Sequence, residues 1–286
     1  MSLNDAIEAI PRKTMVLFFM VDTSGSMSGS KIGALNAAIE EVIPELRTLS
    51  AANADAQIKI AALEFSSGSR WITSSGPVNV DDFRWQYLDA GGVTELGDAC
   101  KKLNEKLSTK AFMQEATGSF APALFLLSDG EPTDDFDGGL EELKKNNWYK
   151  KGIKVAVAIG DDADKQTLAK FTGGMESVLE VHSALMLRKM IRFVSVRASE
   201  VASKSVQAGA FGTAAAVVPK QTDSENPGTT NSPASPAQIP AGTAAAAAGA
   251  GPSIKQQALN TQLQTIAADA SANASANAAA NADDEW

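Results

Sequence analysis

The alternation of short apolar runs with amphipathic segments is the feature that most restricts the fold of this chain. The apolar runs are "MVLFFMV" at 15–21, "IKIAALEF" at 58–65, "ALFLLS" at 123–128 and "IKVAVAIG" at 153–160. Continuous runs of this kind are typical of strands that are covered on both faces. The segments between them, such as "KIGALNAAIEEVIPELRTL" and "LGDACKKLNEKL", carry apolar residues at helical spacing. The pattern predicts an α/β fold: a doubly wound, mostly parallel sheet with helices on both faces.

Two segments depart from the simple alternation. The stretch "SRWITSSGPVNVDDF", within residues 67–90, has Gly and Pro at its breaks and predicts a short strand pair or an edge strand. Further on, "SALMLRKMIRFVSVRASEVA" predicts a last helix that closes the domain near residue 202.

The composition divides the chain into one folded domain and an appendage. After about residue 207 it shifts to Ala, Ser, Thr, Pro, Gly and Asn, which supply too little large apolar surface to offset the cost of ordering the chain. The predicted parts are an N-terminal segment (1–11), a folded domain (12–202), a disordered linker (203–252), a short helix (253–270) and a disordered acidic-aromatic end (271–286). The final "DDEW" suits a short linear docking motif, and a second hypothesis is that it reaches the protein's own ligand site.

Charge and cysteine content limit the classes of partner. The formal net charge is −9, from 25 Lys and Arg and 34 Asp and Glu, which argues against binding to nucleic acid or to anionic membranes. The single cysteine, Cys100, cannot form an intrachain disulfide, and its place in a helical segment predicts a buried side chain. The first apolar run is far shorter than the roughly 20 residues that a membrane span needs. We therefore expect a cytoplasmic protein.

Oxygen-bearing side chains follow the predicted strands. Asp22 ends the first apolar run, with Ser24 and Ser26 close behind, Asp129 ends the third, and the loop "DAGGVTELGDA" supplies Thr94. Ligands of parallel α/β sheets bind beyond the carboxyl ends of the strands, so these side chains are expected at one edge. Magnesium prefers oxygen donors, whereas zinc would favour imidazole or thiolate. The set predicts a Mg²⁺ site, with Mn²⁺ as a substitute.

Other interpretations of the same residues remain open. Taken alone, "DTSGS" fits a helix cap or turn, with Asp22 or Ser30 as the cap, as well as it fits a cation site. The second functional class is a Mg²⁺-dependent phosphoryl-transfer enzyme in which Asp22 accepts phosphate. Haloacid-dehalogenase-like phosphatases would need an aspartate where Ser24 stands, and "GSMSGSKIG" lacks the order of a P-loop. The sole histidine, His182, cannot be placed beside Ser24 or Ser26, which weakens Ser-His-Asp hydrolysis.

Two acidic clusters follow the third and fourth apolar runs. For these residues, capping of helices is favoured over a second ion site, because aspartate is common at helix N-termini. The clusters are Asp134, Asp135 and Asp137, then Asp161, Asp162 and Asp164.

The stretch "DTSGSMSG", with Thr94 in "GGVTELG" and Asp129 in "FLLSDGEPTDD", resembles the metal-ion-dependent adhesion site (MIDAS) of von Willebrand factor A (VWA) domains. The resemblance covers residues 12 to about 200. It implies that the two serines and the threonine coordinate the metal, that the two aspartates hold its waters, and that a partner's Asp or Glu completes the shell. Neutral hydroxyls leave most of the charge of the cation uncompensated, so an outside carboxylate can bind strongly.

The resemblance also implies a function without catalysis. It suggests a Mg²⁺-dependent protein–protein interaction module, an adaptor or scaffold for a kinase, a phosphatase or an AAA+ ATPase. The stretches "LLSDGEPTDDF" and "AIGDDADKQTLAKFTGG" resemble stand-alone bacterial VWA proteins of the tellurite-resistance and stress type.

Overall fold

The computed structural model describes most of the predicted folded domain. It covers residues 12–115 and 118–181, together with residues 185–187, 189, 192, 257, 260, 261 and 264. The predictions for residues 1–11, 203–252 and 271–286 lie outside the described residues, as does His182. In the part of the chain that the structure describes, no helix is long and apolar enough to cross a membrane.

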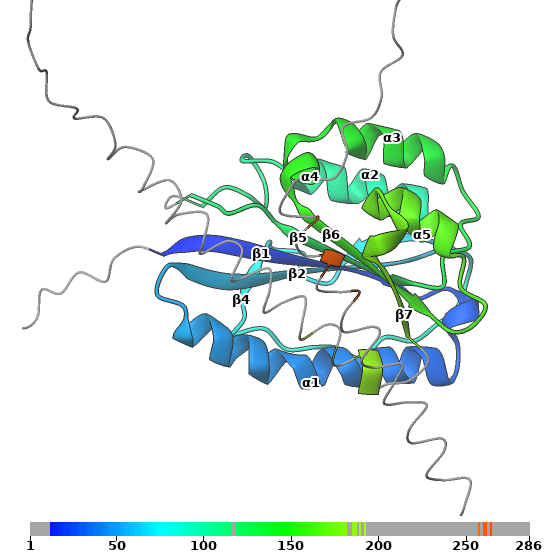
Figure 1. Cartoon of the computed structure of the whole chain (residues 1–286), viewed down its shortest axis with the longest axis horizontal. Helices are drawn as coiled ribbons and strands as arrows, with labels where there is room; N and C mark the ends of the chain where they lie inside the picture. Colours follow the sequence, from blue (N-terminus) through cyan, green and yellow to red (C-terminus); the bar gives the residue numbers. More distant parts are fainter. Residues whose placement is uncertain are drawn as a thin grey trace, which may run out of the picture.

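The strands form a seven-stranded mixed sheet in the order β3-β2-β1-β5-β6-β7, with β4 also paired to β2 (Figure 1). Strands β2, β1, β5, β6 and β7 run parallel to their neighbours, whereas β3 and β4 run antiparallel to β2. The strands are β1 (Lys13–Asp22), β2 (Ala56–Ser66), β3 (Gly68–Trp71), β4 (Val78–Asn79), β5 (Ala123–Ser128), β6 (Ile153–Ile159) and β7 (Val178–Val181).

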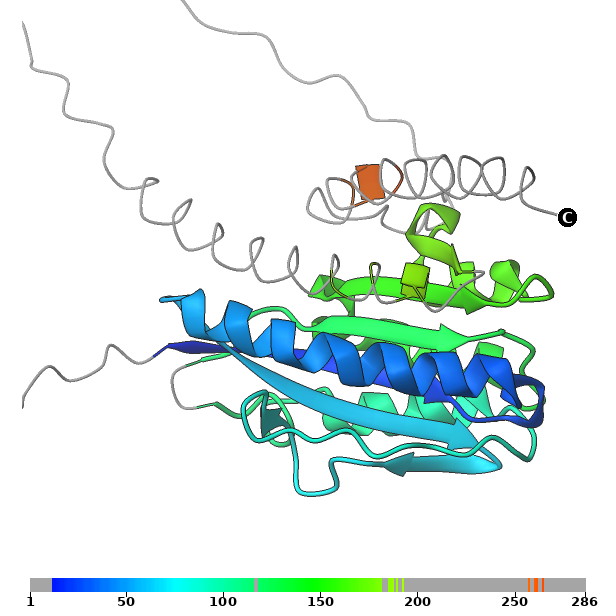
Figure 2. The same ribbon diagram turned by 90° about the horizontal axis from the view of Figure 1, so that it is seen from below.

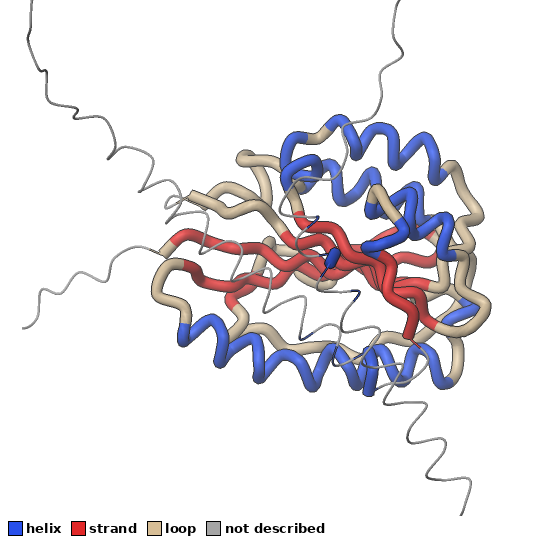
Figure 3. Tube along the Cα trace, viewed as in Figure 1, coloured by secondary structure: helices blue, strands red, loops and turns tan. Residues whose placement is uncertain are grey.

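Helices cover both faces of the sheet, which confirms the doubly wound α/β prediction. Helix α1 lies on one face, and α2, α3, α4 and α5 lie on the other (Figures 1 and 3). The helices are α1 (Ser30–Ala52), α2 (Leu96–Lys106), α3 (Phe136–Lys145), α4 (Asn147–Lys151) and α5 (Lys165–Thr172), with short 3-10 turns η1 (Gly25–Met27) and η2 (Met175–Ser177).

The central strand β1 explains why the apolar runs are continuous. Leu17 and Phe19 belong to the core on the α1 face, while Val16 and Phe18 belong to the core on the α2 face, and each is at most 1% exposed. Alternate residues of a strand point to opposite faces, so a strand covered twice must be apolar at every position. Each fully buried side chain of this size contributes roughly 1.5–3 kcal/mol.

The segment between β2 and α2 forms the outer edge of the sheet. Strands β3 and β4 each pair with β2 rather than with one another. The edge-strand interpretation is therefore confirmed. Strand β7 and helix α4 were not predicted, because each is short: β7 has four residues with the exposed Glu180 among them, and α4 has five.

Acidic side chains cap helices of the α2 face. Asp135 accepts a hydrogen bond from Gly138 N (3.0 Å) at the start of α3, and Asp164 accepts from Gln166 N (3.0 Å) at the start of α5. The capping prediction is confirmed for both residues. The cap interpretation for α1 is wrong, because the N-cap of α1 is Gly29, which makes no side-chain cap bond.

Candidate metal site

Asp22, the last residue of β1, forms the floor of the site. Its side chain is fully buried. One carboxylate oxygen, Oδ1, accepts a hydrogen bond from Ser24 N (2.8 Å), and the other, Oδ2, accepts from Ser128 Oγ (2.6 Å). Burial raises the pKa of Asp22, hydrogen bonds from Ser128 and Ser24 partly offset that rise, and the charge of Asp129 adds to it. A cation at this edge would stabilise both carboxylates.

The hydroxyls of Ser24 and Ser26 converge at the end of the same strand. Their Oγ atoms lie 3.0 Å apart. Ser24 is only 1% exposed, whereas Ser26 is exposed. Gly25 lies between them and donates its N–H to Gly92 O (3.0 Å); a Cβ at Gly25 would lie 3.2 Å from that oxygen. The glycine therefore allows two loops to approach, and the buried floor opens to solvent on the side of Ser26.

The loop that carries Thr94 is joined to both neighbouring loops. Gly92, two residues earlier, has a left-handed φ of 84° and accepts the hydrogen bond from Gly25. Thr94 N donates a hydrogen bond to Thr133 Oγ1 (3.1 Å), and Thr133 N donates to Thr94 O (2.8 Å). Thr94 is 5% exposed. These bonds hold its backbone between the loop after β1 and the loop after β5.

Asp129 follows β5, the strand next to β1, and is 3% exposed. Its Oδ2 accepts a hydrogen bond from Lys31 Nζ (3.2 Å), and the same ammonium donates to Asp162 Oδ1 (2.9 Å). The other oxygen of Asp129, Oδ1, is buried and has no hydrogen-bond partner among the described residues. A buried polar atom without a partner costs about 1–3 kcal/mol, and more when it is charged. A cation or one of its waters would give this oxygen a partner.

The donors at this edge suit a hard cation. The set consists of two carboxylates and three hydroxyls, all oxygen ligands of the kind that Mg²⁺ prefers. Within the described ranges there is no group of three or more His, Cys, Asp or Glu side chains that could hold a metal ion.

Three residues that support the site were not identified from the sequence. Ser128 accepts from Gly130 N (2.8 Å) and donates to Asp22. Lys31 holds Asp129, and Thr133 holds the backbone of Thr94. The sequence offered a signal for Ser128 only, because it directly precedes Asp129 at the end of a predicted strand. Lys31 and Thr133 act through contacts between distant loops, which the sequence does not show.

The phosphoryl-transfer alternative fits this geometry poorly. An attacking carboxylate needs an oxygen that can reach the phosphorus, but Asp22 is fully buried and both of its oxygens accept hydrogen bonds.

Cys100 is also fully buried, as predicted, and burial raises the pKa of its thiol.

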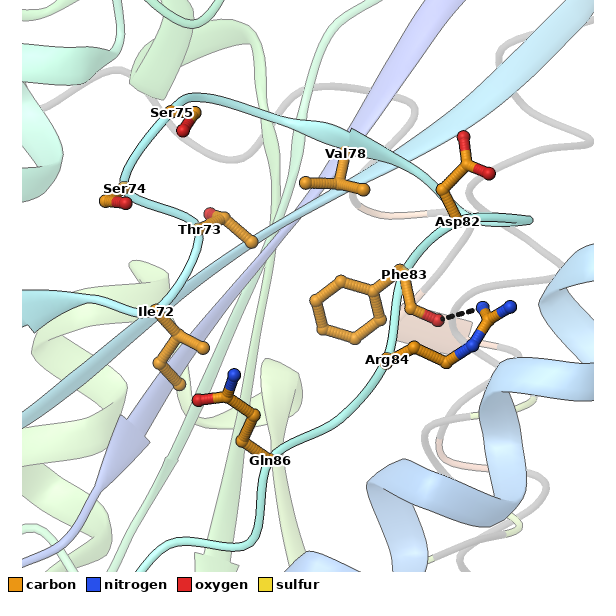
Figure 4. Close-up of a pocket in the computed structure, with 9 residues that line it drawn as sticks. All are labelled: Ile72, Thr73, Ser74, Ser75, Val78, Asp82, Phe83, Arg84 and Gln86. Carbon is orange, nitrogen blue, oxygen red and sulfur yellow. Dashed lines mark hydrogen bonds between the residues drawn. The ribbon is translucent and has the colours of Figure 1, made fainter.

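A shallow pocket of about 290 Å³ lies away from these loops, at the outer edge of the sheet (Figure 4). Its walls come from the segments after β3 and β4. Arg84 at its rim donates to Phe83 O (2.8 Å) and Asp81 O (2.8 Å). None of the residues that line it belongs to the loops that carry the predicted ligands. The lining residues are Ile72, Thr73, Ser74, Ser75, Val78, Asp82, Phe83, Arg84 and Gln86.

The fold and the edge just described define an α/β domain with an oxygen-lined candidate cation site at the carboxyl ends of its parallel strands. A model of the von Willebrand factor type A domain matches residues 17–191, more than half of the chain. The chain belongs to this family. No curated protein sequence matches it significantly.

Solved structures share the fold at low sequence identity. PilB minor pilin from Streptococcus sanguinis is 13% identical, with 67% of this chain and 63% of that one covered and a TM-score of 0.50. A von Willebrand factor type A protein from Catenulispora acidiphila is 18% identical (66% and 43%, TM-score 0.48). Proximal thread matrix protein 1 from the mussel byssus, solved with a zinc-occupied MIDAS motif, is 16% identical (66% and 48%, TM-score 0.49). The chain covers less than half the length of the last two. At 13% identity, the likeness to PilB minor pilin concerns the fold alone.

Proposed function

We propose that this chain is a Mg²⁺-dependent protein–protein interaction module. The observation that carries the proposal is Asp129 Oδ1, a buried carboxylate oxygen without a partner among the described residues, at the edge where the hydroxyls of Ser24 and Ser26 meet. Membership of the VWA family supports it, since VWA domains are typically metal-dependent binding modules.

In this proposal each polar side chain has a distinct role. Ser24, Ser26 and Thr94 bind the cation through their hydroxyls. Asp22 and Asp129 are held by hydrogen bonds from Ser128 and Lys31, and they orient the waters of the cation. The bound cation supplies positive charge that attracts an acidic side chain, because neutral hydroxyls compensate little of that charge.

The open side of the site is suited to a partner's carboxylate. Ser26 is exposed, and so are Gly91 and Gly92 in the facing loop, so no bulky side chain of these residues blocks the approach. Val93, beside the buried Thr94, is 45% exposed and offers an apolar contact at the rim. The partner would therefore present an Asp or Glu next to an apolar group.

The biological setting is also part of the proposal. On the sequence resemblance alone, we assign the module to a bacterial stress or tellurite-resistance-type system, where it would act in the cytoplasm without catalysis. The partners would be a kinase, a phosphatase or an AAA+ ATPase for which the domain serves as adaptor or scaffold.

Calorimetric titration of the full chain with MgCl₂ and MnCl₂ tests the metal site. Ser24→Ala should abolish the heat of binding while circular dichroism stays unchanged. Ser28→Ala, an exposed serine of the same loop outside the ligand set, is the matched control and should bind metal as the wild type does. Normal metal binding by Ser24→Ala would overturn the assignment.

The partner is tested separately from the metal. The immobilised full chain should retain a protein from cell lysate in Mg²⁺ and release it in EDTA, and Thr94→Ala should fail to retain it. A protein that stays bound in EDTA, or that binds Thr94→Ala equally well, would show that recognition does not use the cation.

A further inference from the structure

A residue from the far C-terminal part of the chain lies against the domain. Ser177 Oγ donates a hydrogen bond to Asn260 Oδ1 (2.8 Å), 83 positions away, and Asn260 Nδ2 donates to Glu176 Oε1 (3.3 Å). Asn260 is 4% exposed and Ser177 is 1% exposed. In Figure 2 the orange segment that contains Asn260 lies outside the β6–β7 end of the sheet.

The hydroxyl of Ser177 and the carboxylate of Glu176 are complementary to the amide side chain of Asn260. The oxygen of Asn260 receives a hydroxyl proton, and its nitrogen faces a carboxylate, so both ends of the side chain have a complementary group. A buried amide without such partners would cost about 1–3 kcal/mol for each unsatisfied group. An aspartate at the same place would bring a second carboxylate next to Glu176.

The four described residues of this segment are helical: Gln257, Asn260, Thr261 and Gln264. Thr261 Oγ1 donates to Gln257 O (3.1 Å), one turn earlier. Asn260 is buried, whereas Gln257, Thr261 and Gln264 are exposed. Asn260 is therefore the one of the four that is turned to the domain.

The contact of Asn260 with Glu176 and Ser177 lies next to β7, the edge strand of the sheet. Turn η2, which holds Glu176 and Ser177, leads into β7, the last strand of the sheet order, which pairs with β6. An uncovered edge strand can pair with another chain. Val178, the first residue of β7, pairs with Ala156 of β6, which is level with Leu126 of β5 and Met20 of β1, so the beginning of β7 lies three strands away from β1.

We propose that Glu176 and Ser177 form a docking site for a helix that presents an asparagine amide, and that its occupant is this chain's own segment 253–270. The segment is then an element of the domain, held beside the turn that leads into β7. A connection as long as 193–256 can span on the order of 200 Å when extended. Linkage also keeps the effective concentration of the segment near the millimolar range, which favours binding within one chain.

Cross-linking of the full chain tests the contact. In Ser177→Cys/Asn260→Cys, a short bifunctional thiol reagent should join the two new cysteines within one chain, as mapped by mass spectrometry of the peptides. In the control, Ser177→Cys/Thr261→Cys, the second cysteine is exposed on the same helix, and linkage should be at least tenfold slower. The native Cys100 is fully buried and does not compete. Equal rates in the two variants, or a link between two chains, would overturn docking within one chain.

A charge-rescue series tests the recognition itself. Hydrogen exchange of the amides in 175–181 should become at least tenfold faster in Asn260→Asp, because the new carboxylate faces Glu176. It should return to the wild-type rate in Glu176→Gln/Asn260→Asp, where an amide again faces a carboxylate. Gln264→Asp, an exposed change on the same segment, should have no effect. An unchanged rate in Asn260→Asp, or no recovery in the double variant, would overturn the proposal.

Discussion

Asp22 of β1 and Ser128 of β5 are joined by a hydrogen bond of 2.6 Å across two neighbouring parallel strands, although they are 106 positions apart. The pairing of the strands thus fixes one oxygen of Asp22. Asp129, the next residue after Ser128, is carried to the same edge by the same strand.

Removal of this hydroxyl should destabilise the protein. Ser128→Ala leaves Asp22 Oδ2 buried without its donor, and we expect the free energy of unfolding in urea to fall by about 1–3 kcal/mol. Ser69→Ala is the control, because the buried Ser69 Oγ has no hydrogen-bond partner among the described residues. Removal of the Ser69 hydroxyl breaks no hydrogen bond, so the free energy of unfolding of Ser69→Ala should not fall. Equal effects of the two changes would contradict the role of Ser128.

The loop at Gly92 should tolerate no side chain. Gly92 has a φ of 84°, and a Cβ there would lie 2.6 Å from Ser67 Oγ, so Gly92→Ala must strain or move the loop that leads to Thr94. We expect Mg²⁺ binding, measured by calorimetry, to weaken at least tenfold. At the neighbouring Gly91 a Cβ would meet nothing within 4 Å, so Gly91→Ala should bind Mg²⁺ normally.

Loss of the Lys31 charge should tighten metal binding. Lys31 Nζ lies 3.2 Å from Asp129 Oδ2, so its charge would repel a cation held at the same carboxylate. At an effective dielectric constant of about 20, two unit charges about 4 Å apart interact by about 4 kcal/mol, and partial exposure reduces this value. The repulsion exceeds the contribution of one hydrogen bond to Asp129, about 1 kcal/mol. Lys31→Met should therefore lower the Kd for Mg²⁺ several-fold in titration calorimetry. Lys165→Met removes the same charge from the Glu180 ion pair, and it should leave the Kd within about twofold of wild type. Weaker binding by Lys31→Met would show that positioning of Asp129 dominates.

The cap of α5 should contribute stability that depends on pH. The side-chain hydrogen bond from Thr167 lowers the pKa of Asp164 below its ordinary value of 3.8, against burial, which raises it. Because the pKa is lower in the folded protein, the contribution is complete above pH 3.8 and is lost as the pH falls through the folded pKa. Asp164→Ala should be less stable than wild type by about 1 kcal/mol at pH 7, and the gap should shrink below pH 3.8.

Asp164→Asn controls for titration, because it keeps an acceptor for the N–H groups at the start of α5 and carries no proton that titrates there. Its stability difference from Asp164→Ala should not change with pH. Urea unfolding at several pH values measures all three proteins, and a constant gap between wild type and Asp164→Ala would contradict the assignment.

The sequence predicted the parts of the fold in which local pattern and burial agree. Strand β1 is apolar at every position from 15 to 21 because both of its faces are covered, and that pattern can be recognised without a structure. Strand β7 could not be predicted in the same way, since it has four residues at an edge and exposes Glu180. Short edge strands depend on a neighbour for their stability rather than on their own pattern.

The candidate ligands were also accessible to sequence reasoning, whereas their supports were not. Asp22 and Asp129 each end an apolar run, and parallel strands bring such ends together. Lys31 reaches Asp129 across 98 positions, and nothing in its local sequence separates it from an exposed helical lysine. The same is true of Asn260 and Ser177, whose contact follows from the way distant segments meet.

The position of β1 between β2 and β5 has a consequence for synthesis of the chain. The ribosome produces Asp22 and Ser24 early, yet the floor beneath them is incomplete until β5 has emerged and paired. Nascent chains that end before Ser128 therefore lack the second carboxylate of the proposed site. The proposed site would therefore form only after β5 has paired with β1, while β6 and β7 are still to be added to the sheet.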